Sequence, residues 1–101
     1  MTADQMTTDQ ERVLHRAAQL ATAYLASLDT RPVGRPVDLA ALRTAMGGPL
    51  PESPSDPVAV VEGLAAAADP GLVASAGPRY FGFVVGGGVP AAVGADRKSV
   101  V

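Results

Sequence analysis

The sequence predicts a mostly α-helical chain: three helices, then an extended glycine-rich segment and the start of a fourth helix. Three observations support this fold class. Apolar residues recur at helical spacing in the first third of the chain. Aspartates suited to helix N-caps precede two further apolar stretches. Proline- and glycine-rich stretches separate the helical ones. The 101 residues are enough for one small domain at most.

The composition is poor in the large side chains that fill a hydrophobic core. Apolar residues make up 48% of the chain, but aromatic residues only 4%, and many of the apolar residues are alanine or valine. Burial of apolar surface contributes roughly 25 cal/mol per Å², so small side chains contribute little each. We therefore expect the helices to depend on a larger assembly.

Charge and cysteine content argue against several classes of protein. The net charge of −2 comes without a basic stripe, so we expect no nucleic-acid partner. No apolar run approaches the ~20 residues of a membrane span, and the polar, acidic N-terminus is unlike a signal peptide. The chain has no cysteine, hence no disulfide and no thiolate metal site. We expect a cytoplasmic protein with no membrane partner.

The first helix is expected to begin at a capping box formed by Thr8 and Glu11, after a disordered N-terminus over residues 1–7. Its apolar residues recur at helical spacing. They are Val13, Ala17, Leu20, Tyr24 and Leu28. Prolines 32 and 36 disfavour helix in the residues before them, so an extended connector should follow.

Two shorter helices are expected next. Asp38 is a suitable N-cap for a helix over 39–46, which a pair of glycines ends. Asp56 is a suitable N-cap for a helix over 57–68, whose first residue is a proline. The residues expected to be buried in that helix are Val58, Val61, Leu64 and Ala65. The helical part of the chain thus spans residues 8–76.

Residues 77–96 differ in kind from the helical part. They gather one tyrosine and both phenylalanines into a segment that we expect to be extended, followed by three glycines. Pro90 can then open a fourth helix. A helix of one or two turns is not stable alone, so we expect the chain to be interrupted there.

The last residues, 97–101, differ in composition from everything before them and contain the only lysine. Together with Asp96 they can be encoded by GATCGGAAGAGCGTCGTG, which looks like a sequencing-library adapter read in frame. We expect 97–101 to be a non-native tail; the alternative is a genuine polar C-terminus.

The string GPRYFGFVVGGGVPAAVGAD at residues 77–96 resembles the group II pyridoxal-phosphate-dependent amino-acid decarboxylases. This family includes aromatic-amino-acid, glutamate and diaminobutyrate decarboxylases. Its pattern is small-Pro-Arg-Tyr/Phe-Phe-Gly-Phe, then Gly-Gly, then Pro-Ala-x-x-x-Ala-Asp. The upstream order is similar as well: a long helix, an Arg-Pro-Val turn, a Leu-Pro-Glu turn and an Asp-Pro helix start. The resemblance covers roughly residues 11–96.

The resemblance implies that the chain is the N-terminal flap of a fold-type I α/β enzyme, truncated before the cofactor site and inactive alone. In such enzymes the flap packs across the partner subunit of a homodimer. Pyridoxal phosphate accepts the electrons released when the α-carboxylate of the amino-acid substrate leaves. The family's cofactor-holding Lys, His and Asp match no position here, and Lys98 is not given that role. We expect no catalytic, cofactor-binding or metal-binding residue in this chain.

What the resemblance does assign to this chain is a wall of the substrate pocket. The expected substrate-binding residues are Phe83, Val84, Gly86 and Gly87. Consecutive glycines let backbone N–H groups approach an anionic or planar ligand. Some aromatic-specific members carry Pro-Thr where this chain has Val-Gly-Gly, so the amino acid that is decarboxylated stays open.

The remaining candidate residues favour structural roles. Arg79 could bind a carboxylate ligand, but we expect it to pair with a structural Asp or Glu. Tyr80 and Phe81 are expected to anchor the segment to the following domain. His15, the only histidine, is expected to lie on a helix face without binding a ligand.

Two other functions are compatible with the sequence. One is a stand-alone helical dimerisation or interaction module, for which the end of the chain would be genuine. The other is a different fold-type I pyridoxal-phosphate enzyme that cleaves carbon–carbon bonds. The sequence of the gene beyond codon 96 separates them.

Overall fold

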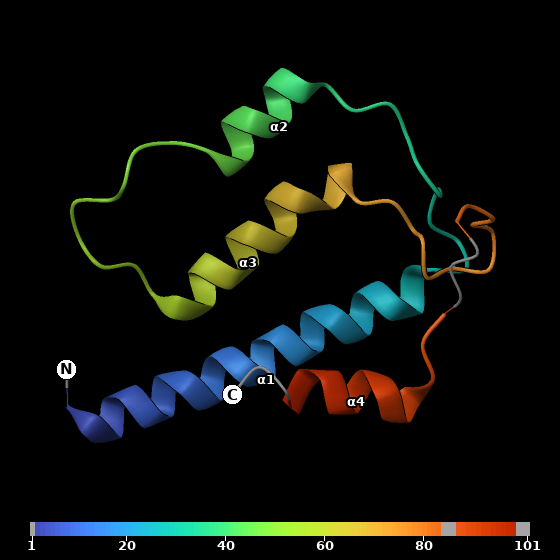
Figure 1. Ribbon diagram of the computed structural model, residues 1–101. Helices are drawn as coiled ribbons and strands as arrows, with labels where there is room; N and C mark the ends of the chain where they lie inside the picture. The colour runs from blue at the N-terminus through green and yellow to red at the C-terminus, as the bar shows by residue number, and fades with distance from the viewer. Residues whose placement is uncertain (1, 84–86, 99–101) are drawn as a thin grey trace.

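Figure 1 shows the computed structural model, which describes residues 2–83 and 87–98. Over these ranges the chain forms four α-helices and one 3₁₀ turn, with no strand. The elements are α1 (Ala3–Ser27), α2 (Leu39–Met46), α3 (Pro57–Ala68), η1 (Asp69–Gly71) and α4 (Pro90–Lys98). The predicted mostly α-helical class is confirmed, as are the bounds of the second and third helices.

The helices form an open arrangement in which α3 lies between α1 and α2 (Figure 1). The radius of gyration is 16.2 Å and the extents are 48 × 37 × 20 Å. A compact domain of about 100 residues has a radius of gyration near 13 Å. The chain is therefore more extended than a compact domain of its length. None of the described helices is both long and apolar enough to cross a membrane.

The N-cap of helix α1 lies six residues earlier than predicted. Thr2 is its N-cap, and the Thr2 side chain accepts a hydrogen bond of 3.1 Å from the backbone N–H of Gln5. Thr8, the predicted cap, instead donates its hydroxyl to a carbonyl one turn earlier in the same helix. The predicted disordered N-terminus is thus wrong for residues 3–7, because Thr2 satisfies an amide that would otherwise fray the first turn.

Very little of the described chain is withdrawn from water. Only Leu28 and Ala74 are buried, at 8% and 2% exposure. The other residues of the predicted inward row on α1 are half-buried, namely Val13, Ala17, Leu20 and Tyr24. The predicted inward row is therefore covered in part.

On α3 the predicted inward residues are only partly covered. Val58, Val61 and Ala65 are half-buried. Leu64 is 57% exposed, which corrects the prediction that it is buried. It lies at the edge of the helix face that Val58, Val61 and Ala65 form.

Aspartate caps begin both short helices, as predicted. The Asp38 side chain accepts from the N–H of Ala40 at 3.1 Å, and that of Asp56 accepts from Ala59 at 3.2 Å. At the end of α2, Gly47 leaves no room for a side chain, because a Cβ there would lie 2.7 Å from the carbonyl oxygen of Arg43. Local capping therefore accounts for where these helices begin and end.

The segment after η1 is a series of turns, which corrects the prediction that its aromatic part is extended. The N–H of Gly77 bonds to the carbonyl of Ala74, and that of Tyr80 to the carbonyl of Gly77. Phe83 has a φ of 55°, in the left-handed region. Helix α4 then begins at Pro90, as predicted, and runs to Lys98.

With only two buried side chains among the residues that the structure describes, the 101-residue chain is expected to unfold gradually when it is isolated. We expect a urea m-value below the range of about 1–3 kcal/mol/M that is usual for small cooperative proteins. Circular dichroism at increasing urea concentration measures it. A steep, single transition with an m-value inside that range would contradict this expectation.

Candidate functional site

The predicted substrate-binding residues do not form an enclosed site in the described part of the chain. Phe83 is 91% exposed and Gly87 is exposed as well. Val84 and Gly86 lie outside the described residues. Phe81, predicted to be a structural anchor, is 92% exposed. The aromatic segment thus presents both phenylalanines to solvent, where a further surface could cover them.

An open groove of about 400 Å³ runs along α1, beside the first turn of α3. Most of its lining residues carry polar side chains. The lining residues are Thr8, Glu11, Arg12, His15, Arg16, Gln19 and Val58. A second hollow of about 260 Å³ lies near Pro57. Neither is lined by a residue of the aromatic segment.

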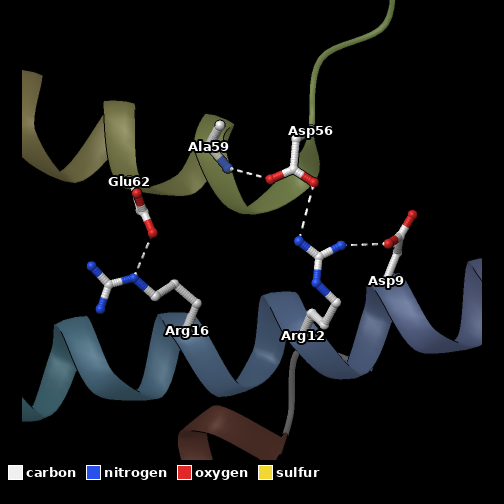
Figure 2. Close-up of polar contacts among 6 residues, drawn as sticks. All are labelled: Asp9, Arg12, Arg16, Asp56, Ala59 and Glu62. Atoms are coloured by element: carbon white, nitrogen blue, oxygen red, sulfur yellow. Dashed lines mark hydrogen bonds and ion pairs between the residues drawn. The ribbon is translucent and has the colours of Figure 1, made fainter.

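Arg12 joins α1 to the start of α3 (Figure 2). Its Nη1 lies 2.8 Å from Oδ1 of Asp9, and its Nη2 lies 3.2 Å from Oδ1 of Asp56. The other oxygen of Asp56 accepts from Ala59 and caps α3. The hydrogen bond with Asp56, and secondarily that with Asp9, raises the pKa of Arg12 above its ordinary value.

Arg16 makes the second contact between α1 and α3. Its Nε donates to Glu62 at 2.8 Å, and its Nη1 donates to the side-chain oxygen of Gln19 at 3.1 Å (Figure 2 shows the Glu62 bond). Side chains in both bridges are solvent-exposed, so both bridges contribute little to stability. Both arginines of the groove are already paired with carboxylates. They therefore join α3 to α1 and do not form a free anion-binding site.

The least exposed charged group of the described ion pairs is Arg31, which follows the end of α1. Its side chain is 14% exposed, and its Nη2 lies 2.5 Å from Oδ1 of Asp69 in η1. Its guanidinium carbon lies 4.8 Å from the centroid of the Tyr24 ring, a cation–π contact. The opposite oxygen of Asp69 is 3.8 Å from Arg35. Arg31 therefore ties the end of α1 to the end of α3.

The aromatic segment is attached at this same junction. The N–H of Ala74 donates to the carbonyl of Val33 at 2.8 Å, and Arg79 donates to the carbonyl of Arg31. The prediction that Arg79 pairs with an acidic side chain is not met among the described residues, where its hydrogen bond goes to the backbone. No local sequence pattern predicts the Arg31–Asp69 pair, because 38 residues separate its members.

The described residues do not fit pyridoxal phosphate or a metal ion as a ligand. The groove beside His15 contains no lysine, and its arginines are engaged as described above. Within residues 2–83 and 87–98, no three His, Asp or Glu side chains converge as a metal site needs. If the cofactor of the resembling family acts with this chain, other residues must hold it.

Comparisons with protein-family models, with curated proteins and with solved structures found no match. A function is therefore inferred from the residues themselves.

The double role of Asp56 gives a prediction. Asp56→Asn should keep the cap of α3, since asparagine is an equally good N-cap, and lose only the exposed bridge to Arg12. Asp56→Ala should lose both and unwind the first turn of α3, at a cost of about 1 kcal/mol. NMR chemical shifts of residues 57–60 measure the helical population. Equal losses in the two variants would show that the cap does not hold this turn.

Proposed function

We propose that this chain is the N-terminal part of a group II pyridoxal-phosphate-dependent amino-acid decarboxylase, a cytoplasmic carboxy-lyase. The observation that carries the proposal is the string over residues 77–96, in which an aromatic Pro-Arg-Tyr-Phe-Gly-Phe run precedes a glycine triplet and a Pro-Ala helix start. The helices upstream of that string would serve as the flap of a fold-type I α/β enzyme and pack across the partner subunit of a homodimer.

The distribution of apolar surface supports an accessory role. Phe81 and Phe83 are both more than nine-tenths exposed, although burying each would stabilise the protein by roughly 1.5–3 kcal/mol. Further large apolar side chains are exposed on every helix from α1 to α3. Examples are Leu14, Leu25, Leu39, Met46, Val60 and Leu64. A catalytic domain packed against these surfaces would supply the burial that the chain lacks.

In this proposal the chain lines the mouth of the substrate site and excludes water from it. Phe83, Val84, Gly86 and Gly87 would face the side chain or the carboxylate of the amino acid. The cofactor, when bound by the remainder of the enzyme, supplies the electron sink for loss of the α-carboxylate. Binding and orienting the substrate are then the contributions of this segment.

A second candidate is a stand-alone helical dimerisation module. It is favoured by a row of exposed apolar residues on α1, spaced seven and four residues apart. They are Leu14, Ala21 and Leu25. A second copy could cover this row, and the chain alone would then sediment as a dimer at micromolar concentration.

The deciding experiment is to sequence the gene beyond codon 96, express the whole product and assay carbon dioxide release from a panel of amino acids with pyridoxal phosphate. We expect the reading frame to continue into a lysine-bearing catalytic domain that decarboxylates one of them. Cleavage of a different carbon–carbon bond would favour the related lyase. A stop codon at once, with a stable dimer, would establish the module instead.

In the whole enzyme, Phe81 and Phe83 provide a matched pair, because they are equally exposed here. Phe83→Ala should raise KM for the amino acid by about tenfold with kcat less affected. The reason is that the lost contact with the substrate is made in both the ground state and the transition state. Phe81→Ala should lower the thermal midpoint and leave KM unchanged. Steady-state kinetics and thermal denaturation of both variants measure this. The reverse pattern would show that Phe81 is the residue at the site.

A further inference from the structure

We propose that Arg31 is a positioning residue, which fixes the path of the aromatic segment 77–83 relative to the end of α1. What this means for substrate binding depends on the function proposed above. The attachment itself does not, because it follows from contacts within the chain.

The Arg31 side chain is held in place by several contacts. Beyond the short contact with Asp69 and the stacking on Tyr24, its guanidinium is 3.5 Å from both the carbonyl oxygen of Asp69 and Oγ of Ser27. Its 14% exposure compares with 48% for Arg12 and 36% for Arg16. An ion pair that is shielded from solvent is screened less by water and salt. Among the described ion pairs, this one is best placed to order its surroundings.

The backbone next to this side chain accepts the hydrogen bonds that attach the aromatic segment. The carbonyl of Arg31 accepts the hydrogen bond from Arg79, and the carbonyl of Val33 accepts that from Ala74. With Arg31 held at Asp69, both carbonyls face the returning chain. The position of the segment therefore follows from the conformation of residues 31–33.

The chain is closely packed where the aromatic segment meets the end of α1. Leu28 and Ala74, the only two buried residues in the described chain, both belong to the junction. A Cβ added at Gly77 would lie 3.2 Å from the carbonyl oxygen of Leu28 and 3.3 Å from that of Ala74. A side chain there would push the segment away from α1, so Gly77 permits the approach that Arg31 orients.

Lysine cannot reproduce this arrangement. A single ammonium group can pair with Asp69, but it cannot form a planar fork toward Asp69 and Ser27 while stacking on Tyr24. Arg31→Lys should therefore keep part of the effect, and Arg31→Met should lose it. Arg43, near the end of α2 and in none of the described ion pairs, provides the matched control Arg43→Met.

Amide hydrogen exchange of the 101-residue chain, followed by NMR, tests the proposal. In the unmodified chain we expect the amides of Ala74 and Gly77 to be protected. In Arg31→Met their exchange should accelerate about fivefold or more, since hydrogen bonds to a charged group are the stronger ones. Arg31→Lys should fall between the two. The amides of Leu20 in α1 and Val61 in α3 should not change, and Arg43→Met should match the unmodified chain.

Three results would overturn the proposal: no protection at Ala74 in the unmodified chain, unchanged exchange in Arg31→Met, or equal acceleration at Leu20 and Val61. If Arg31→Met unfolds the whole chain, Asp69→Asn decides, because it removes the charge and retains an acceptor oxygen. It should accelerate exchange at Ala74 and Gly77 alone. Exchange requires neither cofactor nor substrate, so this test can fail while the decarboxylase proposal holds, and the reverse is equally possible.

Discussion

The shortage of buried apolar surface is the constraint on which the remaining features of this structure depend. With only Leu28 and Ala74 buried among the described residues, no central core sets the positions of the helices. The starts of α1, α2 and α3 are instead set by their own caps, and α1 and α3 are joined by polar contacts at their edges. Such contacts orient elements but stabilise them little. The chain is thus suited to be completed by a further surface.

The parts of the fold that sequence predicts correctly are those set by local chemistry. Asp38 and Asp56 cap helices through amides two or three residues away, so their positions alone predicted the starts of α2 and α3. The predicted start of α1 was wrong because Thr2 and Thr8 are equally good caps by residue type. Which of them caps the helix depends on whether the first turn forms.

The path of the aromatic segment could not be predicted from sequence for the opposite reason. The hydrogen bonds that position it join Ala74 to Val33 and Arg79 to Arg31, and both pairs are more than forty residues apart in the chain. Local propensity suggested an extended run, whereas the structure has turns there and the distant contacts fix where the segment lies. The exposure of Leu64 likewise depends on tertiary packing. Of the four residues predicted to face substrate, the structure describes Phe83 and Gly87 and places both at the surface.

The central claim is that another part of the enzyme covers the aromatic segment. Hydroxyl-radical footprinting of Phe81 and Phe83 tests it most directly, by comparing the 101-residue chain with the product of the whole gene. Both rings are open to solvent in the structure described here. We predict strong labelling of both in the isolated chain and protection of both in the whole protein. Equal labelling of the two forms would contradict the claim that these helices are an accessory to a catalytic domain.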